Sequence, residues 1–436
     1  MSAAIERHFQ RLLQQMPEPN RWLIAHSGGL DSQVLLHLAA KYLPSERLLV
    51  LHVNHHLQSS AERWAQFSAQ QASRYKLPHQ ILNVFPDTSS EEAARRERYA
   101  AFESQIQAGD CLLLGHHGDD QVETMLFRLL RGTGLKGLSG IPAHRKLGAG
   151  KLCRPLLGCL RSDLERYAAE QHLTWIDDPS NQQAVYDRNF LRLDIFPLLE
   201  GRWPGFKQRW LKTSEQLAAS QQLLNEYLDA DLTSHVGVFG ELSLSALHGC
   251  SMQRQDHLLR RWLESQVGVM LNSIQLDEIR RTLISSRADA EPQLKVERVV
   301  IRRYRSALYL TSAETLVPHE LDQLALGKFP LGDGVLQVSS ADAGLSTLEN
   351  VRLVRRKGGE RCRPLGRNGS CTVKKLLQEA GIPPWLKVHW PLLMVDEEVV
   401  AIPGICLCEG WQTKSGGFNA TWCSFALSEC RSFGIL

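Results

Sequence analysis

The chain has 436 residues, which is more than one ordinary hydrophobic core holds, so we expect two or three domains. Hydrophobic residues make up 43% and charged residues 22%, as in typical globular proteins, and the apolar runs are too short to cross a bilayer. The net charge of +3 does not by itself indicate a polyanionic partner. Ten cysteines without a secretory signal predict reduced thiols and a cytoplasmic location rather than a disulfide scaffold.

The first two hundred residues alternate between strand-like and helix-like segments. The strands that we expect are residues 22–26, 48–53, 80–84, 111–115 and 151–154. The helices that we expect are residues 32–42, 61–75, 90–107 and 122–130. Short strands rich in Val, Leu and Ile, separated by helix-length segments, predict an α/β fold with a doubly wound parallel sheet.

A glycine-containing run, Ser27-Gly28-Gly29-Leu30-Asp31-Ser32, lies between the first strand and the first of these helices. Two adjacent glycines let the backbone come close to a bound group, and the following helix offers free N–H donors and a positive dipole end. This pattern predicts a phosphate-binding loop. No Lys-Ser/Thr pair follows the glycines, which excludes the Walker type of loop.

Two further polar clusters follow the ends of other predicted strands. They are His52-Val53-Asn54-His55-His56 and Gly115-His116-His117. Ligands of doubly wound sheets bind beyond the carboxyl ends of the strands. We therefore expect these clusters and the glycine run to line one site.

An acidic cluster begins the next predicted helix. We expect Asp119 to be its N-cap, with Asp120 in the first turn and Glu123 three residues later on nearly the same face. Three carboxylates beside a phosphate site would repel the phosphates unless Mg²⁺ or a cationic substrate lies between them. The pattern therefore favours a functional role over simple stabilisation of the helix.

The rest of the chain changes in character. Helical spacing dominates residues 197–286, strand-like alternation returns in 294–310, and one more helix is expected at 373–380. Residues 351–390 hold ten basic and two acidic side chains, a net charge of +8 that suits a polyanion. We expect a catalytic domain over 1–215, a mainly helical substrate or linker domain over 216–312, and a basic α+β domain over 313–436.

Several motifs together carry a resemblance to a known family. Besides the runs above, they are Gly115-His116-His117-x-Asp119-Asp120-Gln121-x-Glu123-Thr124, Arg131-Gly132-Thr133-Gly134-Leu135, Asp177-Asp178-Pro179-Ser180-Asn181 with Tyr186-x-Arg188-Asn189, and Gly358-Gly359-Glu360-x-x-Arg363-Pro364-Leu365-Gly366-Arg367. The chain resembles the tRNA(Ile)-lysidine synthetases, PP-loop ATP pyrophosphatases, in their long bacterial form. It departs from them at Asn368-Gly369-Ser370-Cys371, where the family pattern is more basic.

The resemblance implies an AMP-forming ligase that makes a C–N bond. ATP would adenylate O2 of the wobble cytidine in a tRNA(Ile) with a CAU anticodon, releasing pyrophosphate. The ε-amine of L-lysine would then attack C2 and displace AMP. A poor oxygen leaving group is thereby converted into a good one.

The resemblance also implies roles for residues. ATP would be bound by Ser27, Gly28, Gly29, Leu30, Asp31, Ser32, His52, Val53, Asn54, Gly115 and His116. Catalytic roles fall to Asp31, Asp120 and Glu123, of which the last two would hold lysine. Arg131 and Arg188 would contact phosphate or AMP. Arg363, Arg367, Lys374 and Lys375 would contact tRNA. We expect Mg²⁺ to arrive with ATP, with Asp31 as its candidate ligand, and no metal caged by protein side chains alone.

Rival interpretations have different sequence requirements. An RNA cytidine-thiolating relative would carry paired Cys-x-x-Cys motifs for an iron–sulfur cluster, and the sequence has none. Its nearest approach, Cys406-Leu-Cys408, has no second pair nearby, so we expect no metal there. A non-catalytic RNA-binding protein would not preserve both the glycine run and the acidic cluster. The sequence leaves open a homodimer, and whether Asp120 and Glu123 bind lysine or Mg²⁺.

Overall fold

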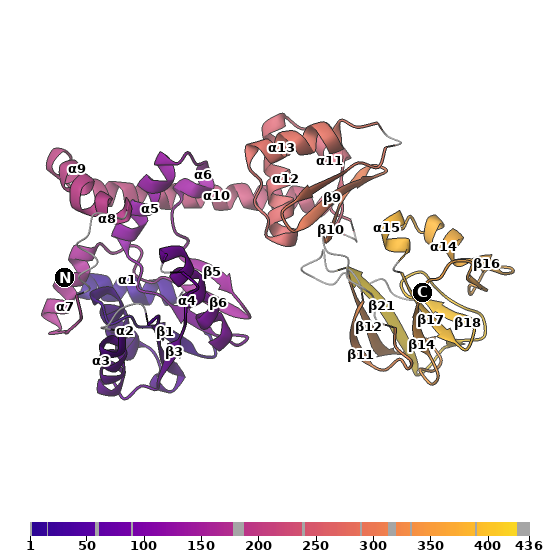
Figure 1. The fold of residues 1–436 in the computed structure, drawn as a ribbon, viewed down its shortest axis with the longest axis horizontal. Coiled ribbons are helices and arrows are strands. Elements are labelled where there is room, and N and C mark those ends of the chain that lie inside the picture. The colour runs from indigo at the N-terminus through magenta and orange to yellow at the C-terminus, as the bar shows by residue number, and fades with distance from the viewer. Residues whose placement is uncertain are drawn as a thin grey trace. The chain divides into compact units, whose positions relative to one another are not determined.

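The structure is a computed structural model, and it divides the chain into two compact units, Met1–Leu223 and Leu224–Leu436, which are described separately (Figure 1). The residues that it describes are 2–14, 16–56, 61–88, 90–177, 187–237, 240–287, 290–312, 320–331, 334–388 and 390–424. Leu57 and residues 178–186, which include most of the predicted Asp177–Asn181 motif and Tyr186, lie outside them. Among the helices of the described residues, none combines the length and the apolar character that a membrane span requires.

The first unit is built on a six-stranded sheet with strand order β3-β2-β1-β4-β6-β5. Its strands are β1 (Trp22–Ala25), β2 (Leu48–Asn54), β3 (His79–Asn83), β4 (Cys111–Leu113), β5 (His144–Leu147) and β6 (Gly150–Cys153). All neighbouring pairs are parallel except β5 with β6. The predicted doubly wound sheet is confirmed. The edge strand β5 was not predicted, because its exposed His144, Arg145 and Lys146 show no hydrophobic alternation.

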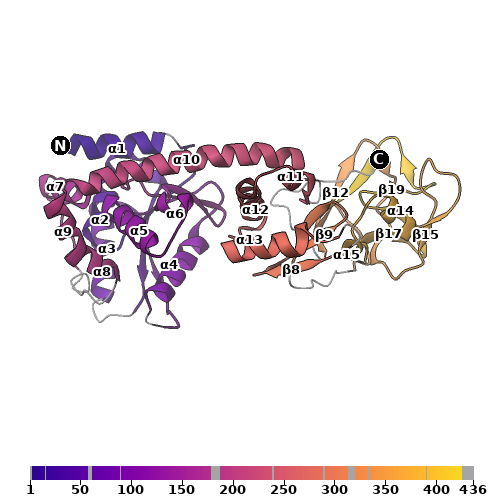
Figure 2. The same ribbon diagram turned by 90° about the horizontal axis from the view of Figure 1, so that it is seen from above.

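Helices cover both faces of this sheet. The helices of its α/β layers are α1 (Ser2–Gln14), α2 (Leu30–Tyr42), α3 (Ala61–Arg74), α4 (Glu91–Gln105) and α7 (Arg161–Glu170). Phe9, Leu35 and Tyr167 belong to one core, which joins α1, α2 and α7 to the sheet, whereas Phe102 of α4 and its C-cap Ile106 pack with Leu112 in another. Because α2 and α4 contribute to different cores, they cover opposite faces of the sheet, and Figure 2 shows these helices from above.

The winding of the sheet reverses between β1 and β4. The chain passes from β1 through β2 to β3 on one side, and then returns to place β4 on the other side of β1. The carboxyl ends of β1 and β4 therefore lie side by side at a switch point, the usual ligand position in such sheets. From these two ends the chain enters α2 and α5 (Gly118–Leu130).

The helix α5 begins at Gly118, four residues before the predicted range of 122–130, and its N-cap is His117 rather than Asp119. The His117 ring accepts the N–H of Asp119 at 3.2 Å, while the Asp120 carboxylate accepts the N–H of His117 at 2.9 Å. These reciprocal bonds satisfy two helix-end donors as a capping box does. The carboxylate of Asp119 instead accepts the N–H of Arg161 at 2.7 Å and pairs with Lys207.

Further helices complete the first unit. They are α6 (Leu135–Leu138), α8 (Asp187–Phe190), a π-helical turn (Leu191–Ile195), α9 (Phe196–Arg202) and α10 (Phe206–His235), which continues into the second unit. Val122 of α5 packs in one core with Leu191, Phe196 and Phe206. This core fixes the π-helical turn against the acidic end of α5.

The first part of the second unit combines helices with an antiparallel sheet of order β7-β10-β9-β8. Its elements are β7 (Leu242–Ser243), α11 (Ser245–His248), α12 (Met252–Val267), α13 (Ser273–Ile279), a π-helical turn (Arg280–Ile284), β8 (Gln293–Val296), β9 (Val299–Tyr304) and β10 (Ala307–Ser312). The strands predicted from the alternation in 294–310 are confirmed. Trp262 is fully buried in the core that α12 shares with this sheet.

The last part of the chain is mainly antiparallel. Two sheets have the orders β11-β12-β21-β13-β20 and β14-β17-β18-β19, and β15 pairs with β16. The strands are β11 (Gly327–Leu331), β12 (Gly334–Ala341), β13 (Gly344–Leu345), β14 (Arg352–Arg355), β15 (Arg361–Cys362), β16 (Cys371–Thr372), β17 (Pro391–Val395), β18 (Glu398–Ile402), β19 (Cys406–Leu407), β20 (Gln412–Thr413) and β21 (Gly417–Ser424). The predicted helix is confirmed as α14 (Val373–Glu379), with α15 (Pro384–Lys387) following it. Trp390 and Trp422 centre this core, with ring centroids 4.6 Å apart.

Candidate active site

A pocket of about 620 Å³ opens at the switch point of the sheet, a volume in the range of small-ligand sites. It is lined by most of the residues for which the sequence predicted ATP contacts: Ser27, Gly29, Leu30, Asp31, Ser32, His52, Val53, Asn54, Gly115 and His116. Asp120 also lines it, whereas Gly28 and Glu123 do not. The three strand ends thus meet in one cavity, at the place that the parallel topology dictates.

The glycine run is held in shape by its own hydroxyl groups. The Ser32 Oγ accepts the N–H of Ser27 at 3.1 Å and donates to the carbonyl of Gly29 at 2.9 Å. Gly28 has a φ of 94°, which residues with a side chain rarely adopt. This turn places the N-terminus of α2 at the pocket, where helix N–H groups and the helix dipole favour an anion.

Gly115 allows the loop after β4 to pass directly against α2. A Cβ atom at this position would lie 3.1 Å from the carbonyl group of Asp31 and from the backbone nitrogen of Ser32. Any larger residue would have to push the two loops apart. The close approach brings the start of α5 next to Asp31.

His117 connects the glycine run to the acidic cluster. Its buried ring lies between three carboxylates, with Nε2 3.5 Å from Asp31 and 3.8 Å from Asp120, and Nδ1 3.8 Å from Asp119. Burial alone would lower the pKa of His117, but the hydrogen bond to Asp31 and the charges of the carboxylates raise it to about 9. Because Nδ1 accepts the N–H of Asp119, the neutral ring carries its proton on Nε2. A second proton, on Nδ1, would replace the hydrogen bond from Asp119.

Arg192 occupies the carboxylates of Asp120 and Glu123. Its Nη2 lies 3.0 Å from Asp120 and 2.9 Å from Glu123, and its Nε donates to the other oxygen of Glu123. Burial raises the pKa of Glu123, although the hydrogen bonds from Arg192 oppose the shift. Burial would also raise the pKa of Asp120, but the neighbouring charge of His117 and other groups lower it. The pair is therefore a built cation site, filled here by a guanidinium.

Arg192 was not among the site residues predicted from the sequence. It lies four residues after Arg188, so helical spacing places both on one face, and that spacing is the signal that could have identified it. Its position in a π-helical turn is typical of functional sites. Other pocket residues were also missed, among them Trp64, Arg98 and Arg161, and the Nη1 atom of Arg161 lies 3.9 Å from Asp31.

A second pocket of about 360 Å³ shares His116 and Asp120 with the first. Its walls carry five arginines: Arg95, Arg128, Arg145, Arg154 and Arg188. Guanidinium groups suit phosphate or carboxylate groups, so this pocket fits an anion. The structure thus brings Arg188 to the site. It does not bring Arg131 there, which is exposed at the end of α5 with its guanidinium 3.9 Å above the Phe127 ring.

Asp31 is the side chain in the first pocket that best fits a magnesium ion. Its Oδ1 is buried and, among the described residues, has only long contacts with cations, 3.5 Å to His117 Nε2 and 3.9 Å to Arg161 Nη1. Carboxylate oxygens are preferred ligands of Mg²⁺, which usually keeps several waters and binds together with substrate phosphates. The donor set therefore fits an ion that arrives with a nucleotide.

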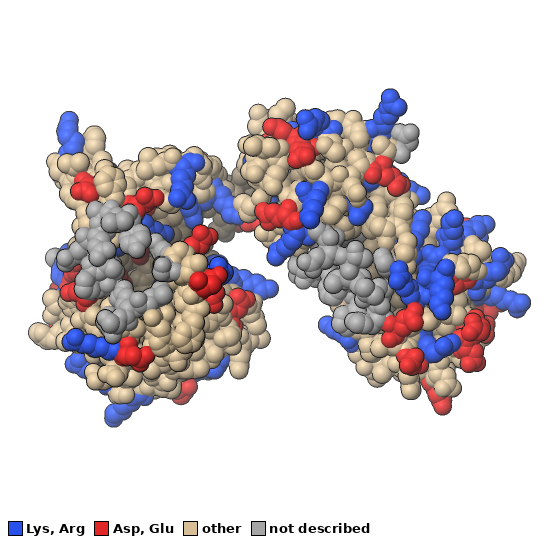
Figure 3. Space-filling model, viewed as in Figure 1, with Lys and Arg blue, Asp and Glu red and all other residues tan. Residues whose placement is uncertain are grey.

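The residues predicted to contact tRNA lie in the second unit. Arg363, Lys374 and Lys375 are exposed, whereas Arg367 is half-buried and pairs with Glu379 at 2.7 Å. Figure 3 shows lysine and arginine side chains gathered over the part that carries α14 and α15. Three of the four cations are therefore available to a polyanion, and the fourth is partly neutralised.

Comparisons with known proteins agree over nearly the whole chain. Three family models match: a PP-loop domain over residues 1–199, a TilS substrate binding domain over 242–309, and a TilS substrate C-terminal domain over 351–422. The tRNA(Ile)-lysidine synthase of Coxiella burnetii is 36% identical over 412 residues, covering 91% of each chain. That of Serratia proteamaculans is 38% identical, covering 93% of this chain and 96% of its own. A solved U34-tRNA thiolase, NcsA from Methanococcus maripaludis, is 19% identical over 49% of this chain and 78% of its own, with a TM-score of 0.40.

Proposed function

The chain belongs to the tRNA(Ile)-lysidine synthase family, and we propose that its first unit joins L-lysine to the wobble cytidine of a CAU anticodon. It is an ATP-dependent ligase acting on tRNA(Ile). The observation that supports this function best is that an anion-binding loop and a two-carboxylate cation site meet across one residue, His117. A cytoplasmic location and the division into residues 1–215, 216–312 and 313–436 belong to the same proposal.

In the first step, the loop from Ser27 to Ser32 and the N-terminus of α2 hold the ATP phosphates. His52, Val53 and Asn54 line the adenine side of the pocket. Asp31 would hold Mg²⁺, which spreads the negative charge of the departing pyrophosphate. The cytidine O2 forms a bond to the α-phosphorus while the bond from that phosphorus to pyrophosphate breaks, leaving an adenylated cytidine.

In the second step, the neutral ε-amine of lysine attacks C2 of the cytidine. The C–N bond forms and the C2–O2 bond breaks, so AMP leaves with O2 on its phosphate. The amine proton passes to a carboxylate or imidazole of the same rim. The arginines of the second pocket, Arg188 among them, hold the phosphate of AMP or the carboxylate of lysine.

Asp120 and Glu123 hold an ammonium group of the substrate lysine in this scheme. Both carboxylates are engaged by Arg192 in the structure, so lysine has to displace that guanidinium to bind. Arg192 thereby keeps a buried pair of carboxylates neutralised until a substrate cation arrives. Lysine binding and movement of the π-helical turn are coupled as a consequence.

The function is tested by incubating the full chain with ATP, Mg²⁺, labelled lysine and total tRNA. We expect the label to enter one tRNA species with a CAU anticodon, with one AMP formed for each lysine incorporated. ATP cleavage to AMP without label in any RNA would contradict the proposal. Labelled ammonia or sulfide donors in place of lysine serve as the control for the rival chemistries.

Asp31→Ala and Glu123→Gln should block different half-reactions. Asp31→Ala should abolish pyrophosphate release, while tRNA binding stays within a few-fold of the wild type. Glu123→Gln loses a charged hydrogen bond of about 1.5–3 kcal/mol, so the lysine requirement should rise roughly ten- to hundredfold while adenylation survives. Rapid-quench measurement of the adenylated RNA separates the steps. Equal loss of both steps in Glu123→Gln would instead assign the carboxylates to Mg²⁺.

The basic C-terminal residues should control tRNA affinity alone. Replacing Arg363, Lys374 or Lys375 by Gln should weaken tRNA binding and reduce the slope of log affinity against log salt by about one unit for each duplex phosphate contact. The use of ATP and lysine at saturating tRNA should not change. Lys295→Gln, an exposed lysine on β8, is the matched control and should leave the slope unchanged. An unchanged slope in all variants would show that these cations do not contact RNA.

A further inference from the structure

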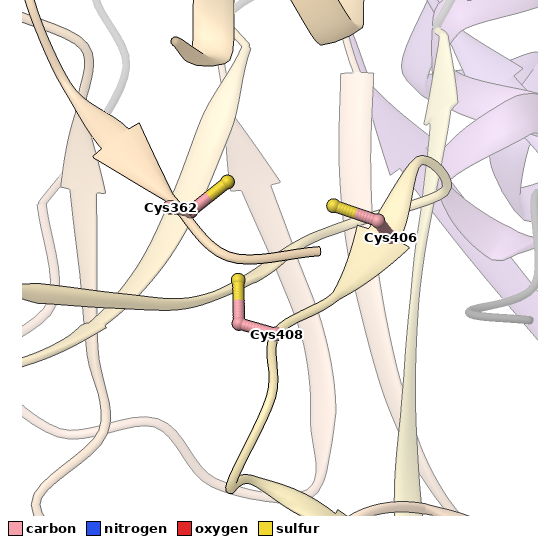
Figure 4. Close-up of side chains that lie close together, drawn as sticks. All are labelled: Cys362, Cys406 and Cys408. Atoms are coloured by element: carbon pink, nitrogen blue, oxygen red, sulfur yellow. The ribbon is translucent and has the colours of Figure 1, made fainter. Parts of the chain in front are cut away.

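Cysteines that are far apart in the sequence gather in the C-terminal part of the chain. The Sγ atoms of Cys362, Cys406 and Cys408 all lie within 4.8 Å of one another. Figure 4 shows the three sulfur atoms pointing toward a common centre. A fourth thiol, Cys371, lies directly opposite Cys362 in the β15–β16 pair, where side chains share one face.

The backbone around these thiols is already fixed. The N–H of Leu365 donates to the carbonyl of Leu407 at 2.7 Å, and the N–H of Glu409 donates to the carbonyl of Arg363 at 2.8 Å. These bonds hold the segment after Cys362 against the segment that carries Cys406 and Cys408. Main-chain contacts therefore hold the backbone of Cys362 close to the backbone of Cys406 and Cys408.

We propose that Cys362, Cys406 and Cys408 bind a zinc ion, with Cys371 placed to supply the fourth ligand. Zinc binds thiolates at about 2.3 Å in a tetrahedron, which separates neighbouring sulfur atoms by about 3.8 Å. The observed spacing needs only a small contraction to reach that geometry. The proposal departs from our expectation of no metal at Cys406-Leu-Cys408, because the further ligands come from residues some forty positions earlier in the sequence.

The state of the thiols suits a thiophilic cation. Cys362 and Cys408 are buried and Cys406 is partly buried, which protects the sulfur atoms from solvent. Zinc binding would release the protons of these thiols, and the resulting thiolates would be the ligands.

Zinc would also close the loop of residues 363–370. This loop runs from Cys362 to Cys371 and carries Arg363 and Arg367. The strands at its two ends, β15 and β16, have two residues each, which is too short to stabilise a hairpin alone. A metal at the base of the loop supplies the missing constraint. The zinc site itself does not rest on the proposed function, because metal binding is measured without tRNA or lysine.

The test uses the full chain, purified under reducing conditions, stripped of metal and titrated with Co²⁺ alone. We expect one equivalent to bind, with thiolate-to-cobalt charge-transfer bands in the near ultraviolet and the visible bands of a tetrahedral ion. Zn²⁺ should displace it. Cys406→Ser should lose these bands or bind at least tenfold more weakly, whereas Cys250→Ser, a thiol that bonds to the Ala246 carbonyl, should match the wild type.

A second measurement guards against misfolding of the variant. Chelation should lower the melting temperature of the wild type, and should not lower that of a Cys406→Ser protein that has a native circular dichroism spectrum. The proposal is overturned if the wild type gives no thiolate bands, or if Cys406→Ser binds cobalt as the wild type does. It is also overturned if intact mass shows the thiols joined as a disulfide after reducing purification, or if the native metal is iron.

Discussion

The ion pair of Arg192 with Asp120 and Glu123 is the interaction on which the site depends. Two carboxylates buried at the start of α5 are costly unless a cation and hydrogen bonds compensate for the lost hydration. The position of Asp120 beside the helix N-terminus lowers part of that cost, and the buried Glu123 depends on the guanidinium. Removing the cation without replacing it would leave uncompensated charge in the centre of the unit.

This constraint connects the site to the fold around it. His117 caps α5 and lies between Asp31 and Asp120, so the phosphate-binding loop and the acidic pair cannot move independently. Gly115 allows the two loops to touch, and the core around Val122 and Leu191 holds the π-helical turn of Arg192. In the proposed reaction, a change of cation at the acidic pair would therefore also affect the loop from Ser27 to Ser32.

Much of this could be predicted from the sequence, because local pattern and parallel topology determine it. The segments that follow β1, β2 and β4 had to meet at the carboxyl edge of the parallel sheet, and they line one pocket. Three features were missed for different reasons. The cap at His117 had a local competitor in Asp119, the strand β5 shows no hydrophobic alternation, and the contact of Arg192 with the acidic pair depends on tertiary packing. Cys362 likewise joins Cys406 and Cys408 only through main-chain contacts between segments some forty residues apart. The sequence spacing of Cys406 and Cys408 alone indicated no site.

The central claim is that one cation at a time occupies the pair of Asp120 and Glu123, Arg192 in the free protein and lysine in the reaction. Equilibrium binding of labelled lysine to Arg192→Met and to the wild type, each with tRNA and a non-hydrolysable ATP analogue, tests it most directly. If Arg192 competes with lysine, the variant should bind lysine more tightly, by roughly tenfold, because the site no longer has to be vacated. Equal or weaker lysine binding by the variant would contradict the account, since Arg192 would then hold the site for lysine instead of occupying it.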